Sequence, residues 1–79
     1  MRLIPIDVEC HSGYKADEYP KYFSRDNDRI EIRQVTDRWY QGETNPEYPV
    51  SNYFKVITTH EEQYIIKHDL ESERWYLCL

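Results

Sequence analysis

Apolar and polar residues alternate in short blocks along this chain, and polar turns separate the blocks. In the first block, residues 4–11, one face would carry Ile4, Ile6, Val8 and Cys10. Alternation with a period of two is typical of a β-strand, whose successive side chains point to opposite faces. The same pattern predicts strands over residues 21–25, 29–40, 53–58, 63–68 and 74–79. No helix-period stripe of ordinary length appears, so the pattern predicts an all-β fold.

The third block, residues 29–40, changes phase. Ile30 and Ile32 share one parity, whereas Val35 and Trp39 have the other. A bulge near residues 33–34 would place all four on the core side and would bend the strand, as a small barrel requires at a corner. Asp37 has the parity of Val35 and Trp39. It is therefore either at a second irregularity or a half-buried carboxylate that needs a partner.

The connections between the blocks favour consecutive antiparallel pairs. Asp26-Asn27-Asp28 favours a tight hairpin, and residues 59–62 and 69–73 are of hairpin length. Residues 41–52, with Gly42, Pro46 and Pro49, read as a surface loop. We therefore expect one domain, residues 1–79, made of a strongly bent sheet or small barrel with five to six mostly antiparallel strands.

Composition narrows the range of functions. A chain of 79 residues with 32% charged residues and a mean hydropathy of −0.93 predicts a soluble, cytoplasmic protein. It contains no apolar run of the length that a membrane span needs. The formal net charge is −5, which disfavours a general nucleic-acid binder because phosphate binding relies on clustered lysine and arginine.

The side chains that usually carry chemistry are present without the spacing that chemistry requires. Cys10 and His11 are adjacent on a strand, so their side chains face opposite sides and form neither a catalytic dyad nor a pair of ligands for one metal ion. Cys10 and Cys78 read as two unlinked thiols. We therefore expect no catalytic residue, no metal and no cofactor, and a protein that is not an enzyme.

Residues 12–18 form the connection that no hairpin signal explains. Ser12, Tyr14 and Lys15 are candidate binding residues, with a hydroxyl, a ring and a cation beside the turn that Gly13 permits. The alternative is that this loop folds over one end of the barrel and plugs the core. Both interpretations stay open at the level of sequence.

Two four-residue segments, residues 37–40 and 73–76, share the order acid-Arg-Trp-Tyr. Alternation predicts that Trp39 and Trp75 enter the core. The opposite face would then carry Arg38, Tyr40, Arg74 and Tyr76. If the third and last strands lie near each other, these four residues would form one binding surface, of a composition favoured at protein interfaces and able to stack on bases.

The segments VECHSGYKADEYPKYF, IEIRQVTDRWY and NYFKVITTHEEQYIIKHDLESERWYLCL give a resemblance over nearly the whole chain. The chain resembles a family of small bacterial and archaeal proteins that is known as a domain of unknown function. Residues 41–52 depart from that pattern because the loop is longer here. The resemblance implies a stand-alone module and brings no activity, cofactor or catalytic residue.

These observations predict a non-enzymatic binding or adaptor module whose partner is another protein. A single-stranded nucleic-acid accessory is the alternative, because small β-barrels present stacking rings well. No membrane partner is expected. An edge strand offers a route to a homodimer.

Overall fold

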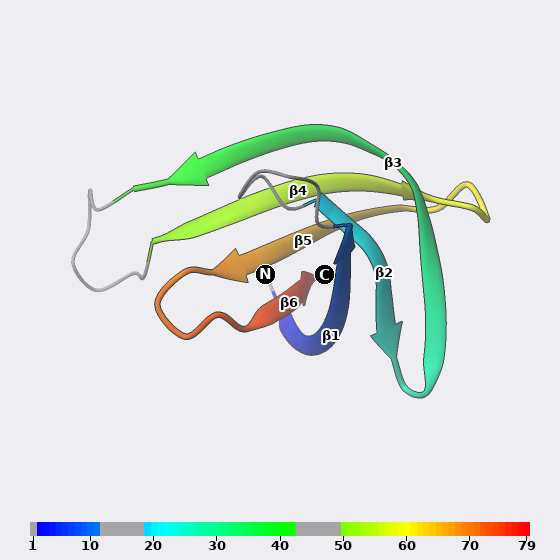
Figure 1. Cartoon of the computed structure of the whole chain (residues 1–79), viewed down its shortest axis with the longest axis horizontal. Coiled ribbons are helices and arrows are strands. Elements are labelled where there is room, and N and C mark those ends of the chain that lie inside the picture. Colours follow the sequence, from blue (N-terminus) through cyan, green and yellow to red (C-terminus); the bar gives the residue numbers. More distant parts are fainter. Residues whose placement is uncertain (1, 12–18, 43–49) are drawn as a thin grey trace.

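The computed structural model describes residues 2–11, 19–42 and 50–79. Its strands are β1 (Leu3–His11), β2 (Tyr19–Arg25), β3 (Asp28–Gln41), β4 (Ser51–Thr58), β5 (Gln63–Asp69) and β6 (Trp75–Cys78). Each strand pairs antiparallel with the next, and β6 returns to β1, so the sheet closes into a barrel (Figure 1). The predicted all-β barrel is confirmed. The described residues form no helix of the length and apolar character that crossing a bilayer requires.

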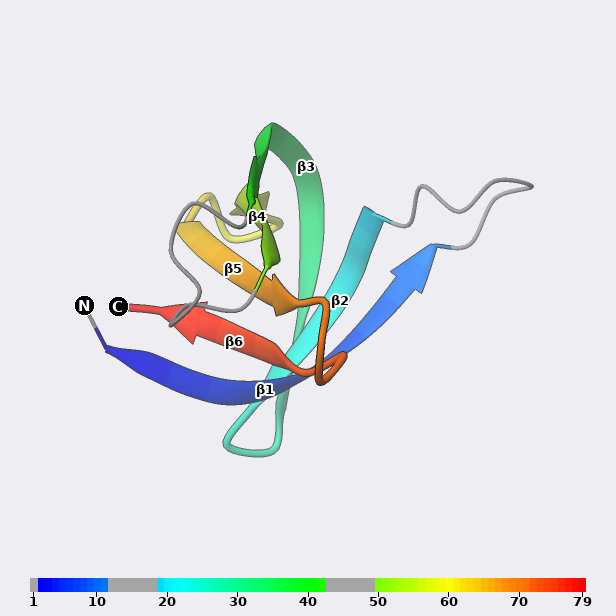
Figure 2. The same ribbon diagram turned by 90° about the vertical axis from the view of Figure 1, so that its left-hand side faces the viewer.

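Two strands bend and take part in two sheets. Residues 3–6 of β1 pair with β6 and residues 7–11 pair with β2. Likewise, residues 28–31 of β3 pair with β2, and the strand from Ile32 onward pairs with β4. We call β4, β5, β6 and the adjoining parts of β3 and β1 the large sheet. The curvature of β1 and β3 is visible in Figures 1 and 2.

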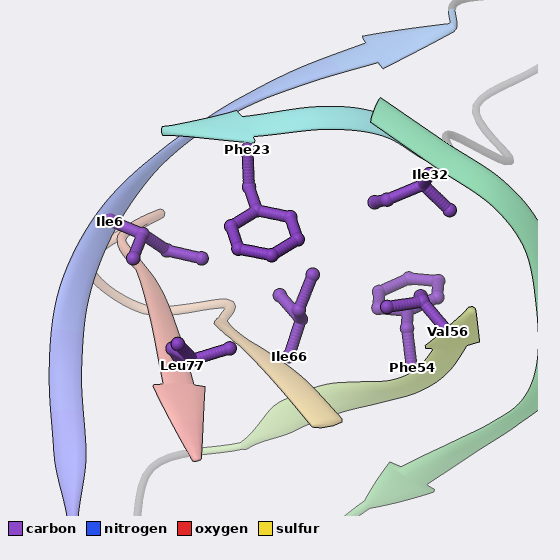
Figure 3. Packing of buried hydrophobic residues seen from close by; sticks show 7 residues of the cluster. All are labelled: Ile6, Phe23, Ile32, Phe54, Val56, Ile66 and Leu77. Carbon is purple, nitrogen blue, oxygen red and sulfur yellow. The ribbon is translucent and has the colours of Figure 1, made fainter. Parts of the chain in front are cut away.

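Every strand contributes at least one buried side chain to a single core. The core residues are at most 9% exposed and point toward one another in Figure 3: Ile6, Phe23, Ile32, Phe54, Val56, Ile66 and Leu77. The predicted alternation holds in β1, β4, β5 and β6, because these residues have the inward parity read from the sequence. Trp75 is half-buried and packs against this core, as predicted.

Strand β3 contains two bulges. The register with β4 shifts between Ile32 and Gln34, which confirms the predicted bulge, and again between Val35 and Asp37. The second shift leaves Thr36 as the extra residue and turns Asp37 outward, so Asp37 is exposed at a second irregularity. It also reverses every later residue of β3.

The prediction that Trp39 enters the core is therefore wrong. Trp39 is 39% exposed and lies opposite Tyr53 on the outer face of the large sheet. Arg38 instead lies opposite Phe54, which is 1% exposed and belongs to the core face. Directly opposed residues of an antiparallel pair share a face, so Arg38 lies on the inner side.

The predicted hairpin at residues 26–28 is present as a two-residue turn. Arg25 and Asp28 pair, and the residues between them, Asp26 and Asn27, have φ angles of 51° and 70°. A positive φ at both central positions is the geometry whose twist matches that of the flanking strands. Asp and Asn adopt this geometry more readily than other residues with a side chain.

Candidate functional site

The residues predicted for binding do not form one surface. Ser12, Tyr14 and Lys15 lie outside the described residues, so the choice between plug and binding loop stays open there. Strands β4 and β5 separate β3 from β6, so the third and last strands are not neighbours and the other four predicted residues are not joined into one surface. Arg38 and Tyr40 lie on the inner face of β3, whereas Tyr76 lies on the outer face of β6 opposite Lys67. Arg74 is exposed in the turn before β6.

Arg38 is part of a continuous chain of ring contacts across the inner face. Its guanidinium carbon lies 5.6 Å from the centre of the Tyr19 ring and 5.5 Å from that of Phe54. The Phe54 ring is 5.7 Å from that of Trp75, and His68 stacks on Trp75 at 4.0 Å with planes 3° apart. These distances fall within the range of cation–π and aromatic contacts.

Five strands, β2 to β6, contribute one residue each to this inner chain. The inner chain consists of three rings, a guanidinium and an imidazole. Tyr40 continues the inner face beyond Arg38 and is 59% exposed. Where they are exposed, such side chains can contact planar or anionic groups.

A cleft lies beside the inner chain, where β2 and β3 diverge. The pairing of these strands ends at Tyr22 and Glu31, yet β3 continues to Gln41. Residues 19–21 of β2 and 32–35 of β3 line a cleft of about 250 Å³. That volume lies below the roughly 300 Å³ at which small-molecule sites begin, so the cleft suits a side chain better than a cofactor.

Along this cleft, one edge of β3 has no partner strand among the described residues. For residues 33–41, no described residue forms a ladder on the side away from β4. We call this side the β3 edge. An edge strand presents backbone N–H and C=O groups in the spacing that another strand would complete.

The cleft is bordered by positive charge in an acidic chain. Lys21 and Arg33 line it, and both are exposed. The Arg33 guanidinium lies 3.4 Å from the Glu61 carboxylate, an ion pair whose side chains are 48% and 75% exposed. An ion pair this exposed contributes little to stability, so Arg33 can exchange Glu61 for another carboxylate.

A second row of side chains crosses the outer face of the large sheet. Trp39, Tyr53, Lys67 and Tyr76 lie directly opposite one another on four successive strands. The Trp39 and Tyr53 rings stack with centres 5.4 Å apart and planes 4° from parallel. The Lys67 ammonium is 5.9 Å from the centre of the Tyr53 ring. We call these four residues the outer row.

Two other features give weaker support for a binding site. A hollow of about 550 Å³ lies where β1 bends and is bordered by Asp7 and Asp26, and its described lining residues include no cation. Among the described residues, no group of three or more His, Cys, Asp and Glu side chains is placed to hold a metal ion.

The two thiols form no disulfide with each other, as predicted. Burial raises the pKa of the Cys78 thiol above its usual 9.0, and the nearby Lys67 lowers it by a smaller amount. Because the thiolate is the reactive form, Cys78 is a weak nucleophile at neutral pH.

Sequence reasoning missed two members of the inner chain. His68 shares its parity with Tyr64 and Ile66, so alternation along β5 already placed it inward. Tyr19 precedes a proline outside the predicted strand, and nothing in the alternation indicates that its ring reaches Phe54.

Comparison with known proteins adds no relative from which a role could be carried over. No family model matches the chain, and neither a curated protein nor a solved structure matches it.

Proposed function

We propose that this chain is a non-catalytic interaction module that binds an extended segment of a partner protein along the β3 edge. The observation that carries the proposal is the continuation of β3 for ten residues beyond Glu31, its last partner in β2. Strand addition to such an edge is a recurring mode of peptide recognition, in which backbone hydrogen bonds supply affinity and pockets supply specificity.

The surroundings of the edge favour a particular kind of segment. The cleft of about 250 Å³ beside Pro20 and Val35 offers a place for one apolar side chain of the added strand. Lys21 and Arg33 favour a carboxylate near it. Tyr19, 45% exposed, presents a ring to the same strand. The partner segment is therefore extended, with acidic residues next to an apolar one.

A second copy of this chain is a poorer occupant of the edge. Antiparallel pairing of two β3 edges centred between Val35 and Thr36 would set Arg33 of one copy opposite Arg38 of the other. Like charges opposed across a strand pair are destabilising. Charge complementarity therefore favours a different, acidic partner.

The proposal is tested with peptides selected from a random 12-residue display library against the purified protein. Bound peptides are resynthesised with N-methyl groups on alternate residues, in both phases, and titrated by calorimetry. An added strand directs every second N–H toward β3, so one phase should abolish binding and the other should preserve it. Equal loss in both phases, or failure to select any binder, would overturn strand addition.

Charge variants locate the binding site. Lys21→Gln with Arg33→Gln should weaken peptide binding about 3- to 10-fold, as expected for two partly exposed ion pairs. Arg2→Gln removes an exposed positive charge outside the cleft and should leave the affinity unchanged. If Arg2→Gln has the same effect as the cleft variants, the peptide responds to overall charge and the cleft is not its site.

A further inference from the structure

The outer row is not part of the hydrophobic core. The core lies on the opposite face of the large sheet, and Trp39 remains 39% exposed. The Tyr53 hydroxyl lies 2.8 Å from Gln41 Oε1, to which it donates a hydrogen bond. Stacking on Trp39 and this hydrogen bond hold the Tyr53 ring in place before any ligand arrives. Large rings held in fixed positions on a surface are typical of recognition sites.

The charge on this face differs from that of the whole chain. The next row on the same face places Asp37 opposite Lys55, followed by Ile65 and Cys78. Together the two rows contain two lysines and one aspartate, and the row on the other side, with Gln41, Ser51 and Asp69, adds a second aspartate, so the charges on this face balance. Many of the acidic residues that give the chain its net charge of −5 are exposed in the connections between strands: Asp26, Glu61, Glu62, Glu71 and Glu73.

We propose that the outer row is a binding platform for single-stranded nucleic acid. Unpaired bases would extend the stack on the exposed Trp39 indole and on Tyr76, while Lys67 and Lys55 contact phosphates. Base–aromatic stacking beside a cationic track is the general mode by which proteins bind single strands without sequence preference. The row spans three strand spacings, about 14 Å, which suits a short stretch of bases.

The same features disfavour other occupants. A duplex keeps its base faces stacked internally and so could not use the rings. A second copy packed face to face would set Lys55 and Lys67 against the same lysines. A strongly acidic protein would gain from the two lysines but would leave the stacked rings without a matching surface. The cleft beside the β3 edge shares no residue with the outer row, so the chain would be an adaptor that joins an extended protein segment to a single strand.

The experiment measures fluorescence anisotropy of a labelled dT12 oligonucleotide titrated with the full chain. Because few lysines take part, the logarithm of the affinity should fall with the logarithm of salt concentration with a slope of about −1.4, the value for two phosphate contacts. Trp39→Ala should weaken binding about 10-fold, and Lys67→Gln about 3- to 10-fold. A duplex of the same length should bind more weakly than dT12.

The matched control is Arg2→Gln, which removes one exposed positive charge outside both proposed sites, and circular dichroism checks that each variant is folded. No binding of dT12 at 20 mM salt and 100 µM protein would overturn the platform. So would an effect of Arg2→Gln equal to that of Lys67→Gln, since binding would then follow net charge alone. If Trp39→Ala does not fold, Lys67→Gln against Arg2→Gln decides. Failure here leaves the peptide test unaffected, because Lys21 and Arg33 do not belong to the outer row.

Discussion

At the scale of single residues, Thr58 holds the turn between β4 and β5 through a buried hydroxyl. The residue is fully buried, and its Oγ1 accepts hydrogen bonds at 3.2 Å from the backbone N–H groups of His60 and Glu62. Glu61 between them has a φ of 64°, a conformation that side-chain-bearing residues adopt at a cost. The hydroxyl therefore offsets part of the strain in the turn.

Thr58→Val should lower the free energy of unfolding by about 1 kcal/mol, because two turn N–H groups lose their acceptor while the shape is kept. Both donors belong to exposed residues and can bind water, which keeps the cost at this lower end. Urea unfolding measures the change. Thr59→Val, the same substitution at the exposed neighbouring position, should cost less than half as much; equal costs would contradict the role of the turn hydroxyl.

Tyr64 links stability to alkaline pH. Burial raises its pKa above the usual 10.0, and the hydrogen bond that its hydroxyl donates to Glu62 at 3.1 Å adds to the effect. The folded state therefore keeps the proton where the unfolded chain has lost it. The resulting stability is fully present below pH 10 and falls as the pH rises through the folded-state pKa.

Tyr64→Phe should therefore flatten the decline of stability between pH 9 and pH 11. The measurement is the free energy of unfolding in urea at several pH values for wild type and variant. The difference between the two proteins should shrink as the pH rises. A difference that does not change with pH would show that Tyr64 ionisation is not linked to folding.

At the scale of elements, strand alternation predicted which residues face the core wherever the alternation continues unbroken along the strand. In β1, β4, β5 and β6 the inward residues were correct, because buried apolar side chains mark every second position. The first bulge in β3 was also predictable, because the apolar residues change parity between Ile32, before the bulge, and Val35, after it. The second bulge left no such mark: after Thr36 the apolar residue that remained, Trp39, is amphipathic and suits either face.

The outer-row proposal depends on that second bulge, which is why the sequence misplaced Trp39. It turns Arg38 inward to meet Phe54 and Tyr19, and turns Trp39 outward to stack on Tyr53. Contacts of this kind join residues from different strands, so the alternation of residues within one strand does not predict them.

The alternation in β5 can be tested directly. Ile66 is fully buried whereas its neighbour Ile65 lies on the outer face. Ile66→Val should cost about 1 kcal/mol of unfolding free energy, because the cavity left by the methyl group cannot fill with solvent. Ile65→Val should cost less than 0.5 kcal/mol, as is usual at a surface. Thermal or urea unfolding of the two variants decides, and a larger loss at Ile65 would contradict the assigned faces.

The β2–β3 turn should respond to substitution in the way that its backbone requires. Asn27 has a φ of 70°, so Asn27→Ala should lower the free energy of unfolding by about 1 kcal/mol. Asn27→Gly should be neutral or slightly stabilising, because glycine adopts this conformation without strain. Thermal unfolding of both variants is the measurement. Equal stability of the alanine and glycine variants would argue against a positive φ here.

At the scale of the whole molecule, the closed barrel keeps the two proposed binding surfaces apart from the core. The core fills the interior, the cleft lies where β2 and β3 diverge, and the outer row lies on the face of the large sheet opposite the core. Trp39 belongs to the outer row and also to the strand that carries the β3 edge. The cleft and the outer row share no residue, so substitutions of Lys21 or Arg33 should leave the outer row intact, and substitution of Lys67 should leave the cleft intact.

The pairing of β1 with β6 also has a consequence for folding speed. Arg2 and Leu79 exchange both backbone hydrogen bonds at 2.8 Å, so the barrel is a ring of strand pairs in which one pair spans nearly the whole sequence. Bringing that pair together costs the most chain entropy, so it should form late, after the hairpins. Ile4→Val, in β1, should then speed unfolding and leave the folding rate nearly unchanged. If residues 2 and 79 were joined by a short linker and the chain opened between Asp26 and Asn27, the late pair would become β2–β3, and the same substitution would slow folding.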